Sequence, residues 1–365
     1  MITVIENGQI VTSSEIIRDG RIVICDGRIV EVASCRGALP EQAEVIDAEG
    51  CYVSAGFIDL HTHGGGGCDF MDIDVDAWVT AAETHAAHGT TLLYPTTLTS
   101  TLELLYATFD NYDRAVAANH RGAAFGGLHL EGPYFAYGQR GAQDPRYLRN
   151  PEPEEYLAIL ERSHDIARWS SAPELPGTHA FGRELAKRGI LASMAHTDAT
   201  FEQAQAAFEN GFTHLTHFYS CMSTVTRRNA FRYAGVLEFG YYEDGVTVEI
   251  IADGIHVPSS LLRLIRKIKG ADRIALCTDS MRAAGMPEGP SVLGGKADGL
   301  PVIVEDGVAK LPDRTAFAGS VATADRLVRT MMSDGGASLV EAVRQMTATP
   351  ALIMRIDDRK GSIRK

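Results

Sequence analysis

Residues that can bind a metal ion or transfer a proton stand where successive apolar runs of this sequence end. His61 and His63 lie at the end of FIDLHTH, Glu131 at the end of GLHLE, His196 at the end of ILASMAH and Asp279 at the end of ALCTD. Imidazole and carboxylate groups are common ligands of catalytic divalent cations and common general acids and bases. Each residue alone has an ordinary structural explanation, such as a capped turn or a satisfied core histidine, so the argument depends on the whole set.

His61 and His63 are two positions apart, and on an extended strand both imidazoles point to one face. That geometry suits a shared metal ion. The four glycines at 64–67 either form a flexible turn or let the backbone approach a ligand closely. Asp279 ends a nearly continuous apolar run, where a carboxylate is costly unless it is paired, hydrogen-bonded or bound to metal.

Two other segments contain candidates that compete with a structural role. His214 and His217 are three positions apart, so on a strand only one of them can point to a common centre. We choose His217, because it lies nearer the end of THLTHF. His256 follows VTVEIIADG, whereas Glu174 precedes a Leu-Pro-Gly turn signal, which favours a structural role for that carboxylate.

These residues need a scaffold that brings strand ends together. Apolar, β-branched segments predict strands at 57–61, 90–96, 124–131, 167–174, 190–196, 213–218, 246–254 and 273–280. Helix-like segments alternate with them at 77–89, 102–122, 182–189, 201–211 and 259–270, several ending at glycine. Strands alternating with helices predict an α/β fold of the (β/α)8 barrel type, in which catalytic side chains project from the C-terminal strand ends. All but one of the predicted strands end at or beside a candidate residue.

The segments outside this alternation predict smaller elements. The first 50 residues combine short β-branched runs with the dipeptides Asn7-Gly8, Asp19-Gly20 and Asp26-Gly27, which indicates antiparallel hairpins with turns at those dipeptides. A hairpin-like insertion follows at 296–311, and two helices are expected near 321–334 and 338–349.

Composition narrows the class of protein. The chain has 365 residues, 45% of them hydrophobic, which is enough for a sizeable core. A net charge of −13 disfavours nucleic-acid and anionic-membrane partners, so an anionic substrate would need a local basic pocket. The six cysteines include no C-x-x-C pair, and no apolar stretch reaches the ~18 residues of a membrane span. We therefore expect a soluble cytoplasmic protein.

The ordered set of segments resembles the amidohydrolase superfamily, and more closely the N-acetylglucosamine-6-phosphate deacetylases. The segments are GFIDLHTHGGGG, LHLEGPYF with RGAQDP, APEL, MAHTDAT, THLTHFYSCM, EIIADGIHVP, LCTDSM and FAGS. The resemblance implies a metal-dependent barrel at 56–350 and a small β-sandwich domain built from residues 1–55 and 351–365, the latter apparently truncated. It also implies a homodimer that removes acetate from an amino-sugar phosphate.

The resemblance also implies roles for individual residues. Glu131, His196 and His217 match the family's metal ligands, and Asp279 matches its general acid/base and contacts the metal. His256 matches the residue beside the substrate carbonyl. Sugar-contacting stretches correspond to Ala142, Gln143, Ser220, Cys221, Phe317, Ala318 and Gly319. Because this chain keeps H-x-H, His61 and His63 could hold a second ion with Glu131 bridging. Zinc is expected, with iron, manganese and cobalt left open.

Two features bear on how the sugar phosphate is held. Ser220-Cys221-Met222 stands where relatives have Asn-Ala-Met, which puts the local sugar contacts in doubt. The loop TVTRRNAFRY contains Arg227 and Arg228, either of which could bind the phosphate, in some relatives across a dimer interface.

Three alternatives stay open. The substrate could be the galactosamine epimer. The protein could be another amidohydrolase, although those enzymes usually hold a carboxylated lysine on the fourth strand, and ARWSSAPEL contains no lysine. The non-catalytic alternative is a scaffold that binds a sugar phosphate, since a fold alone does not establish function.

Overall fold

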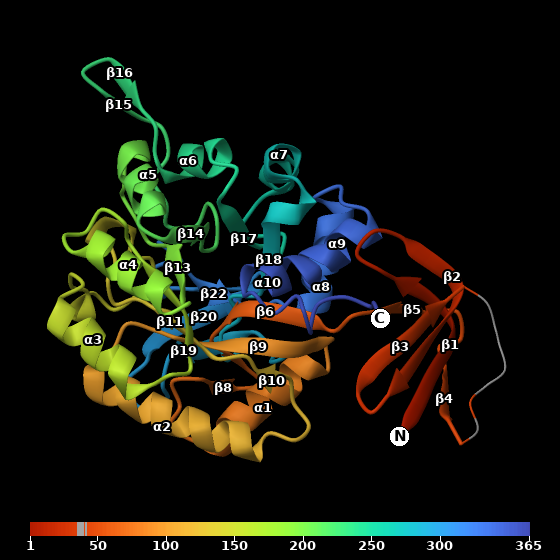
Figure 1. The fold of residues 1–365 in the computed structure, drawn as a ribbon. Coiled ribbons are helices and arrows are strands. Elements are labelled where there is room, and N and C mark those ends of the chain that lie inside the picture. Colours follow the sequence, from red (N-terminus) through yellow and green to blue (C-terminus); the bar gives the residue numbers. More distant parts are fainter. Residues whose placement is uncertain (35–39, 41) are drawn as a thin grey trace.

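The computed structural model describes residues 1–34, 40 and 42–365, and its centre is a parallel barrel (Figure 1). The barrel strands are β6 (Phe57–Thr62), β9 (Thr90–Thr97), β11 (Leu128–Glu131), β12 (Ile166–Ser171), β13 (Leu191–Met194), β14 (Phe212–Leu215), β17 (Thr247–Ile251) and β18 (Ile274–Cys277). They pair in chain order, and a parallel bridge between Thr62 and Ser280 closes the ring. All eight predicted strands are confirmed, with the third divided into β10 (Ala124–Phe125) and β11.

Helices cover the outside of the barrel (Figure 1). They are α1 (Val75–Ala86), α2 (Leu102–Ala118), α3 (Pro153–Arg162), α4 (Thr178–Lys187), α5 (Phe201–Glu209), α6 (Val236–Tyr242), α7 (Ser259–Lys269), α8 (Ala324–Ser333), α9 (Leu339–Gln345) and α10 (Ala348–Ile353). Short 3-10 turns lie at Tyr137–Gln139, Pro145–Tyr147 and Ala271–Arg273. The second helix predicted near the C-terminus is thus two short helices, α9 and α10.

Local sequence signals explain where several helices begin, and apolar side chains explain where they pack. Asp74 and Thr101 accept N-terminal backbone N–H groups of α1 and α2, and Thr200 forms a capping box with Gln203 in α5. The inner helix faces and outer strand faces form one buried cluster that includes Trp78. Burial of this apolar surface stabilises the barrel and fixes the strand ends relative to one another.

A separate five-stranded sheet lies beside the barrel (Figure 1). Its strands are β1 (Ile2–Val11), β2 (Ile16–Cys25), β3 (Arg28–Ala33), β4 (Glu44–Asp47) and β5 (Tyr52–Ser54). Ile363 from the C-terminal segment packs in the same apolar cluster as Ile10 and Ile22, so both ends of the chain contribute to this unit. Among the described residues after Ile353, none lies in a helix or strand.

The predicted turns at Asn7-Gly8 and Asp19-Gly20 are wrong. Both dipeptides lie within long strands, where Gly8 pairs with Gly20 and the register shifts on either side. Asn7 and Asp19 have φ values of 58° and 49°, so the left-handed backbone forms a bulge instead of reversing the chain. Only Asp26-Gly27 connects two strands, β2 and β3.

The predicted insertion is part of a four-stranded antiparallel sheet. It comprises β19 (Gly289–Leu293), β20 (Leu300–Glu305), β21 (Val308–Lys310) and β22 (Phe317–Ser320). Two small hairpins complete the fold: β7 (Gly64–Gly65) with β8 (Cys68–Asp69), and β15 (Thr226–Arg228) with β16 (Phe231–Tyr233).

The tetraglycine segment approaches its own chain closely. A Cβ atom on Gly64 would lie 2.1 Å from the carbonyl oxygen of Cys68, and one on Gly66 would lie 2.3 Å from Thr84 Oγ1. Gly66 also has a φ of 63°. Residues 64–67 therefore form a tight hairpin against α1, and none of them lines the pocket described below.

Two general findings concern cysteines and membranes. Cys25, Cys51, Cys68, Cys221 and Cys277 are free thiols, while Cys35 lies outside the described residues. Within the described part of the chain, none of the helices combines the length and the apolar character needed to cross a membrane.

Candidate active site

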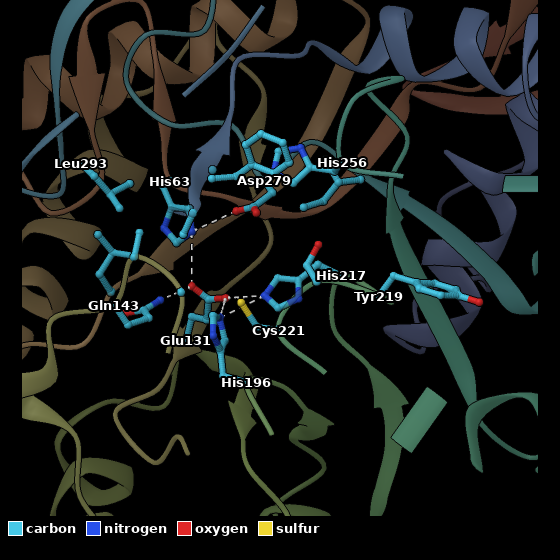
Figure 2. A pocket seen from close by; sticks show the side chains of 18 residues that line it. His63, Glu131, Gln143, His196, His217, Tyr219, Cys221, His256, Asp279 and Leu293 are labelled. Atoms are coloured by element: carbon cyan, nitrogen blue, oxygen red, sulfur yellow. Dashed lines mark hydrogen bonds and ion pairs between the residues drawn. The ribbon is translucent and has the colours of Figure 1, made fainter. Parts of the chain in front are cut away.

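Glu131, at the C-terminal end of β11, is the centre of a cluster of predicted ligand residues (Figure 2). Its Oε1 atom lies 3.1 Å from His217 Nε2 and 3.3 Å from His196 Nε2. Its Oε2 atom lies 3.4 Å from His63 Nε2. The donor atoms of Glu131, His196 and His217 all lie within 4.8 Å of one another, which is compatible with one bound ion.

A second group of donors adjoins the first. The Nε2 atoms of His61 and His63 lie 3.3 Å apart, so the two imidazoles share one face of β6 as their spacing predicts. Asp279 Oδ1 lies 3.3 Å from His61 Nε2 and 3.2 Å from His63 Nε2. His61 also connects the groups, because its Nε2 atom lies 3.5 Å from Glu131 Oε1.

The histidine tautomers fit a metal site. His196 Nδ1 donates to the carbonyl oxygen of Gln139 at 2.8 Å, and His63 Nδ1 donates to that of Thr96 at 3.2 Å. A carbonyl oxygen can only accept, so each neutral ring keeps its Nε2 lone pair for the cluster. Hydrogen bonding of the remote ring nitrogen is the usual arrangement of metal-binding histidines. The residues present therefore fit a divalent cation.

Electrostatics favour the same conclusion. Burial by itself raises the pKa of Glu131, but the surrounding histidines, His61 first among them, outweigh burial and hold the pKa well below its usual range. Burial acts in the same way on Asp279, and His61 with His63 nevertheless lowers its pKa. Two buried carboxylates are thus ionised near neutral pH, and either protons on the histidines or a bound cation must balance their charge.

Three of the cluster residues have unusual backbone conformations. His196, His217 and Asp279 have φ values of 46°, 29° and 47°, a region that non-glycine residues seldom occupy. Each lies just past the end of its strand, where the chain turns away while the side chain faces the cluster. Strained backbone of this kind concentrates at functional sites, where the surrounding structure maintains it.

A pocket of about 340 Å³ opens beside the cluster. Its wall includes Glu131, His63, His196, His217 and Asp279 from the cluster, and the predicted residues Ala142, Gln143, Ser220, Cys221, His256, Phe317 and Gly319. Gln143 has a defined contact, because its Nε2 donates to Glu131 Oε2 at 2.7 Å while its Oε1 accepts the backbone N–H of Thr99 at 2.9 Å. Gln143 therefore orients Glu131.

His256 is held by Asp253 at the edge of this pocket. Its Nδ1 donates to Asp253 Oδ2 at 2.8 Å, and Asp253 Oδ1 accepts the backbone N–H groups of Ile255 and His256, both at 2.8 Å. Burial raises the pKa of Asp253, but His256 and these backbone donors outweigh it and lower the pKa. Because Nδ1 donates to Asp253, a donation from Nε2 into the pocket requires the imidazolium form of the ring.

Three predicted contact residues do not reach the pocket. Ala318 is fully buried in an apolar cluster with Met281 and is absent from the pocket wall, because the side chains of β22 alternate. Arg227 and Arg228 lie on the β15–β16 hairpin, which projects from the barrel (Figure 1) and is exposed throughout. No lysine or arginine lines the pocket among the described residues, so the expected basic pocket is not formed by the chain alone.

Sequence reasoning missed several residues around the site. Tyr219, Leu98 and Leu293 line the pocket, but nothing in their local sequence distinguishes them. Glu249 and Arg168 lie buried inside the barrel, hydrogen-bonded to each other at 2.5 Å. The sequence signal for each was a charged residue within a predicted buried strand, VTVEII for Glu249 and ARWSS for Arg168.

The sequence favours roles outside the metal cluster for His214 and Glu174, and both lie outside it. His214 lies outside the cluster, with Nε2 3.4 Å from Glu249 Oε2, whereas His217 contacts Glu131. Glu174 accepts hydrogen bonds from Thr197 Oγ1 and the backbone N–H of Asp198, both at 2.6 Å. Glu174 therefore supports the loop after β13 and does not enter the pocket wall.

Comparison with known proteins agrees with this architecture. The sequence model of the amidohydrolase family matches residues 52–365. The N-acetylglucosamine-6-phosphate deacetylase of Haemophilus influenzae is 31% identical over 98% of this chain and 91% of its own length. The N-acetylgalactosamine-6-phosphate deacetylase of Escherichia coli is 30% identical over 100% of this chain and 93% of its own. The crystal structure of N-acetylglucosamine-6-phosphate deacetylase from Pasteurella multocida superposes with a TM-score of 0.91, at 29% identity, covering 100% of this chain and 93% of that one. The chain therefore belongs to the amidohydrolase family, within the group that contains the N-acetylglucosamine-6-phosphate deacetylases.

Proposed function

We propose that this protein hydrolyses N-acetylglucosamine 6-phosphate to glucosamine 6-phosphate and acetate. The observation that carries this proposal is the position of Asp279, which contacts two histidines of the donor cluster and also lines the pocket. A group in that position can exchange protons with a reacting substrate beside a bound cation. The substrate follows from the names of the relatives, which cover nearly the whole chain.

We assign the metal ligands as His61, His63, Glu131, His196, His217 and Asp279. The two adjoining donor groups, joined by Glu131, support two ions per subunit, with one as the alternative. Zinc suits the mixed imidazole and carboxylate donors, and iron, manganese or cobalt suit them as well. A divalent cation held there supplies Lewis acidity and lowers the pKa of a water molecule from 15.7 towards ~7.

Asp279 then moves the proton that amide hydrolysis requires. Its lowered pKa keeps it ionised, so it can accept a proton from the water that attacks the acetyl carbon. It next delivers this proton to the amide nitrogen as the C–N bond breaks. The electron pair of that bond therefore leaves on a neutral amine, and acetate is the second product.

His256 is placed to polarise the acetyl carbonyl. Asp253 fixes its ring through Nδ1, and in the imidazolium form Nε2–H would donate to the carbonyl oxygen as negative charge develops there. We propose that Ala142, Gln143, Ser220, Cys221, Phe317 and Gly319 contact the sugar, since all of them line the pocket.

Phosphate binding requires a cation, and among the described residues of one subunit no lysine or arginine lines the pocket. The exposed hairpin β15–β16 offers Arg227 and Arg228 on β15, opposite the exposed side chain of Phe231 on β16. We propose a homodimer in which this hairpin delivers one arginine to the partner's pocket, where a guanidinium can bind phosphate with two hydrogen bonds. We also propose a cytoplasmic location, which the free thiols favour.

The second candidate function is deacetylation of N-acetylgalactosamine 6-phosphate. The relative that bears this name is 30% identical and spans this whole chain, close to the 31% of the N-acetylglucosamine-6-phosphate deacetylase of Haemophilus influenzae. The two substrates differ only at one hydroxyl group.

An acetate-release assay on protein of measured metal content separates these proposals. We expect N-acetylglucosamine 6-phosphate to be deacetylated with a higher kcat/KM than its galactosamine epimer or the unphosphorylated sugar. Faster turnover of the epimer would support the second candidate. Absence of acetate from all three compounds, with metal bound, would contradict the substrate assignment and leave the family unchanged.

A further inference from the structure

Glu249, on β17, contacts two of the proposed metal ligands from inside the barrel, and its side chain is fully buried. Its Oε1 atom lies 2.9 Å from His61 Nδ1 and accepts the backbone N–H of His217 at 3.2 Å. One carboxylate oxygen thus joins His61 on β6 to His217, two residues after the end of β14. The contact with His217 also supports a backbone whose φ of 29° is seldom occupied.

Arg168, on β12, balances the charge of Glu249. Its Nη1 donates to Glu249 Oε2 at 2.5 Å and to the carbonyl oxygen of Leu60 at 3.2 Å. Its Nη2 donates to Thr216 Oγ1 at 2.8 Å, and its Nε donates to Ser193 Oγ at 3.1 Å. The guanidinium is fully buried and hydrogen-bonded on every nitrogen, so it holds the carboxylate in one position.

A metal ion at Glu249 itself is disfavoured. His61, Glu249 and Cys277 do bring donor atoms within 4.8 Å of one another. The guanidinium of Arg168 already contacts Glu249, however, and would repel a second positive charge in the buried interior. Displacing it would leave a buried arginine without its partner. Glu249 is therefore better explained by what it does to the histidines.

We propose that Glu249, balanced by Arg168, is a positioning residue for the metal centre. It selects the His61 tautomer with Nδ1 protonated, so that the Nε2 lone pair faces Asp279 and Glu131. It also anchors the backbone from which His217 reaches Glu131. This inference rests on the proposed function to the extent that His61 and His217 are taken as metal ligands.

The substitution Glu249→Asp tests the inference. Aspartate keeps the charge that Arg168 needs, but it is one methylene shorter and cannot hold His61, His217 and Arg168 together. Zn²⁺ affinity, measured by competition with a chromophoric chelator, should fall by about 10–100-fold, as it does when the partner of a ligand histidine is lost. The absorption spectrum of the Co²⁺-loaded variant should shift, because the geometry around the ion changes.

Asp72→Asn is the matched control. Asp72 is a buried carboxylate paired with Arg282 at 3.0 and 3.2 Å, and within the described residues its side chain makes no hydrogen bond to a proposed ligand. It should lower the unfolding temperature and leave Zn²⁺ affinity unchanged.

The outcomes separate the two proposals. Wild-type affinity and an unshifted Co²⁺ spectrum in folded Glu249→Asp would overturn the positioning role while leaving the proposed function intact. A wild-type protein that binds no divalent metal would overturn the proposed function first. If Glu249→Asp does not fold, imidazole ¹⁵N shifts of the zinc-loaded wild type decide the question, because a deprotonated Nδ1 on His61 would overturn the inference.

Discussion

His61 Nε2 and His63 Nε2 lie 3.3 Å apart and both face Asp279 Oδ1. His63 Nδ1 donates to the carbonyl oxygen of Thr96. In the neutral ring the Nε2 atom therefore carries a lone pair, which is directed at His61 Nε2. Such a pair is stable when a cation or a proton lies between the rings. This relationship is the structural basis for expecting a second ion.

His63→Ala should therefore lower the metal content from two ions per subunit to one. The group of Glu131, His196 and His217 stays complete in this variant. Elemental analysis after dialysis against metal-free buffer measures the content, and exposed His179→Ala is the control. An unchanged metal content would contradict the two-ion assignment.

Asp279→Asn should retain metal and lose turnover. Asparagine has nearly the same shape and keeps one oxygen for the cation, but it can neither accept the proton of water nor return it to the amine. We expect kcat to fall by about 10²–10⁴-fold, the usual contribution of a general acid/base. The measurement is acetate release at equal metal content, and wild-type turnover in the variant would rule out the role of Asp279.

His256→Ala and Asp253→Asn should act on kcat in a graded way. Loss of His256 removes a donor to the developing oxyanion, worth about 10²–10³-fold in other hydrolases. Asp253→Asn leaves the ring in place but removes the carboxylate charge beside it, so we expect a smaller fall of about 10-fold through weaker electrostatic stabilisation of the oxyanion. Steady-state kinetics should show little change in KM for Asp253→Asn. A change in KM alone would assign both residues to substrate binding.

The barrel was predictable because its signals are local. Each parallel strand is buried on both faces and appears as a short apolar run, and Gly follows several helices. The position of Asp279 and His217 at strand ends then follows from the fold, since such barrels collect those ends at one face. The two bulges of the N-terminal sheet were not predictable, because Asn-Gly and Asp-Gly favour left-handed backbone equally in a turn and in a bulge.

The supporting contacts were less accessible to sequence reasoning. Glu249 and Arg168 are 81 residues apart, and their pairing depends on which strands face each other across the barrel. Gln143 lines the pocket, and its amide also holds Glu131, a contact that only the loop geometry reveals. The absence of a cation from the described pocket wall likewise depends on where the β15–β16 hairpin projects.

Lys269 should make stability depend on pH in the alkaline range. Burial, and then the charge of Arg273, lowers the pKa of Lys269 to about 8, whereas an unfolded lysine titrates near ~10.4. Between these values the unfolded chain binds more protons, so the free energy of unfolding rises with pH over this window. Lys269→Met should remove that rise, and exposed Lys267→Met should not. The test is to measure the free energy of unfolding in urea at several pH values from 7.5 upward, about one unit apart. Parallel pH profiles of that free energy for wild type and Lys269→Met would contradict the prediction.

Arg228→Ala should raise KM for the phosphorylated substrate by about 10-fold and leave the unphosphorylated sugar unaffected, because only the phosphate needs the guanidinium. Arg227→Ala is the comparison that identifies which arginine acts.

A mixture of Arg228→Ala and Asp279→Asn subunits tests delivery across the interface. In a mixed dimer the Arg228→Ala subunit keeps its own Asp279 and receives Arg228 from its partner, so about one quarter of all sites should regain wild-type KM if the subunits exchange randomly. If Arg228→Ala and Arg227→Ala each keep a normal KM and the mixture shows no recovery, the hairpin does not bind the phosphate. Another cation must then do so.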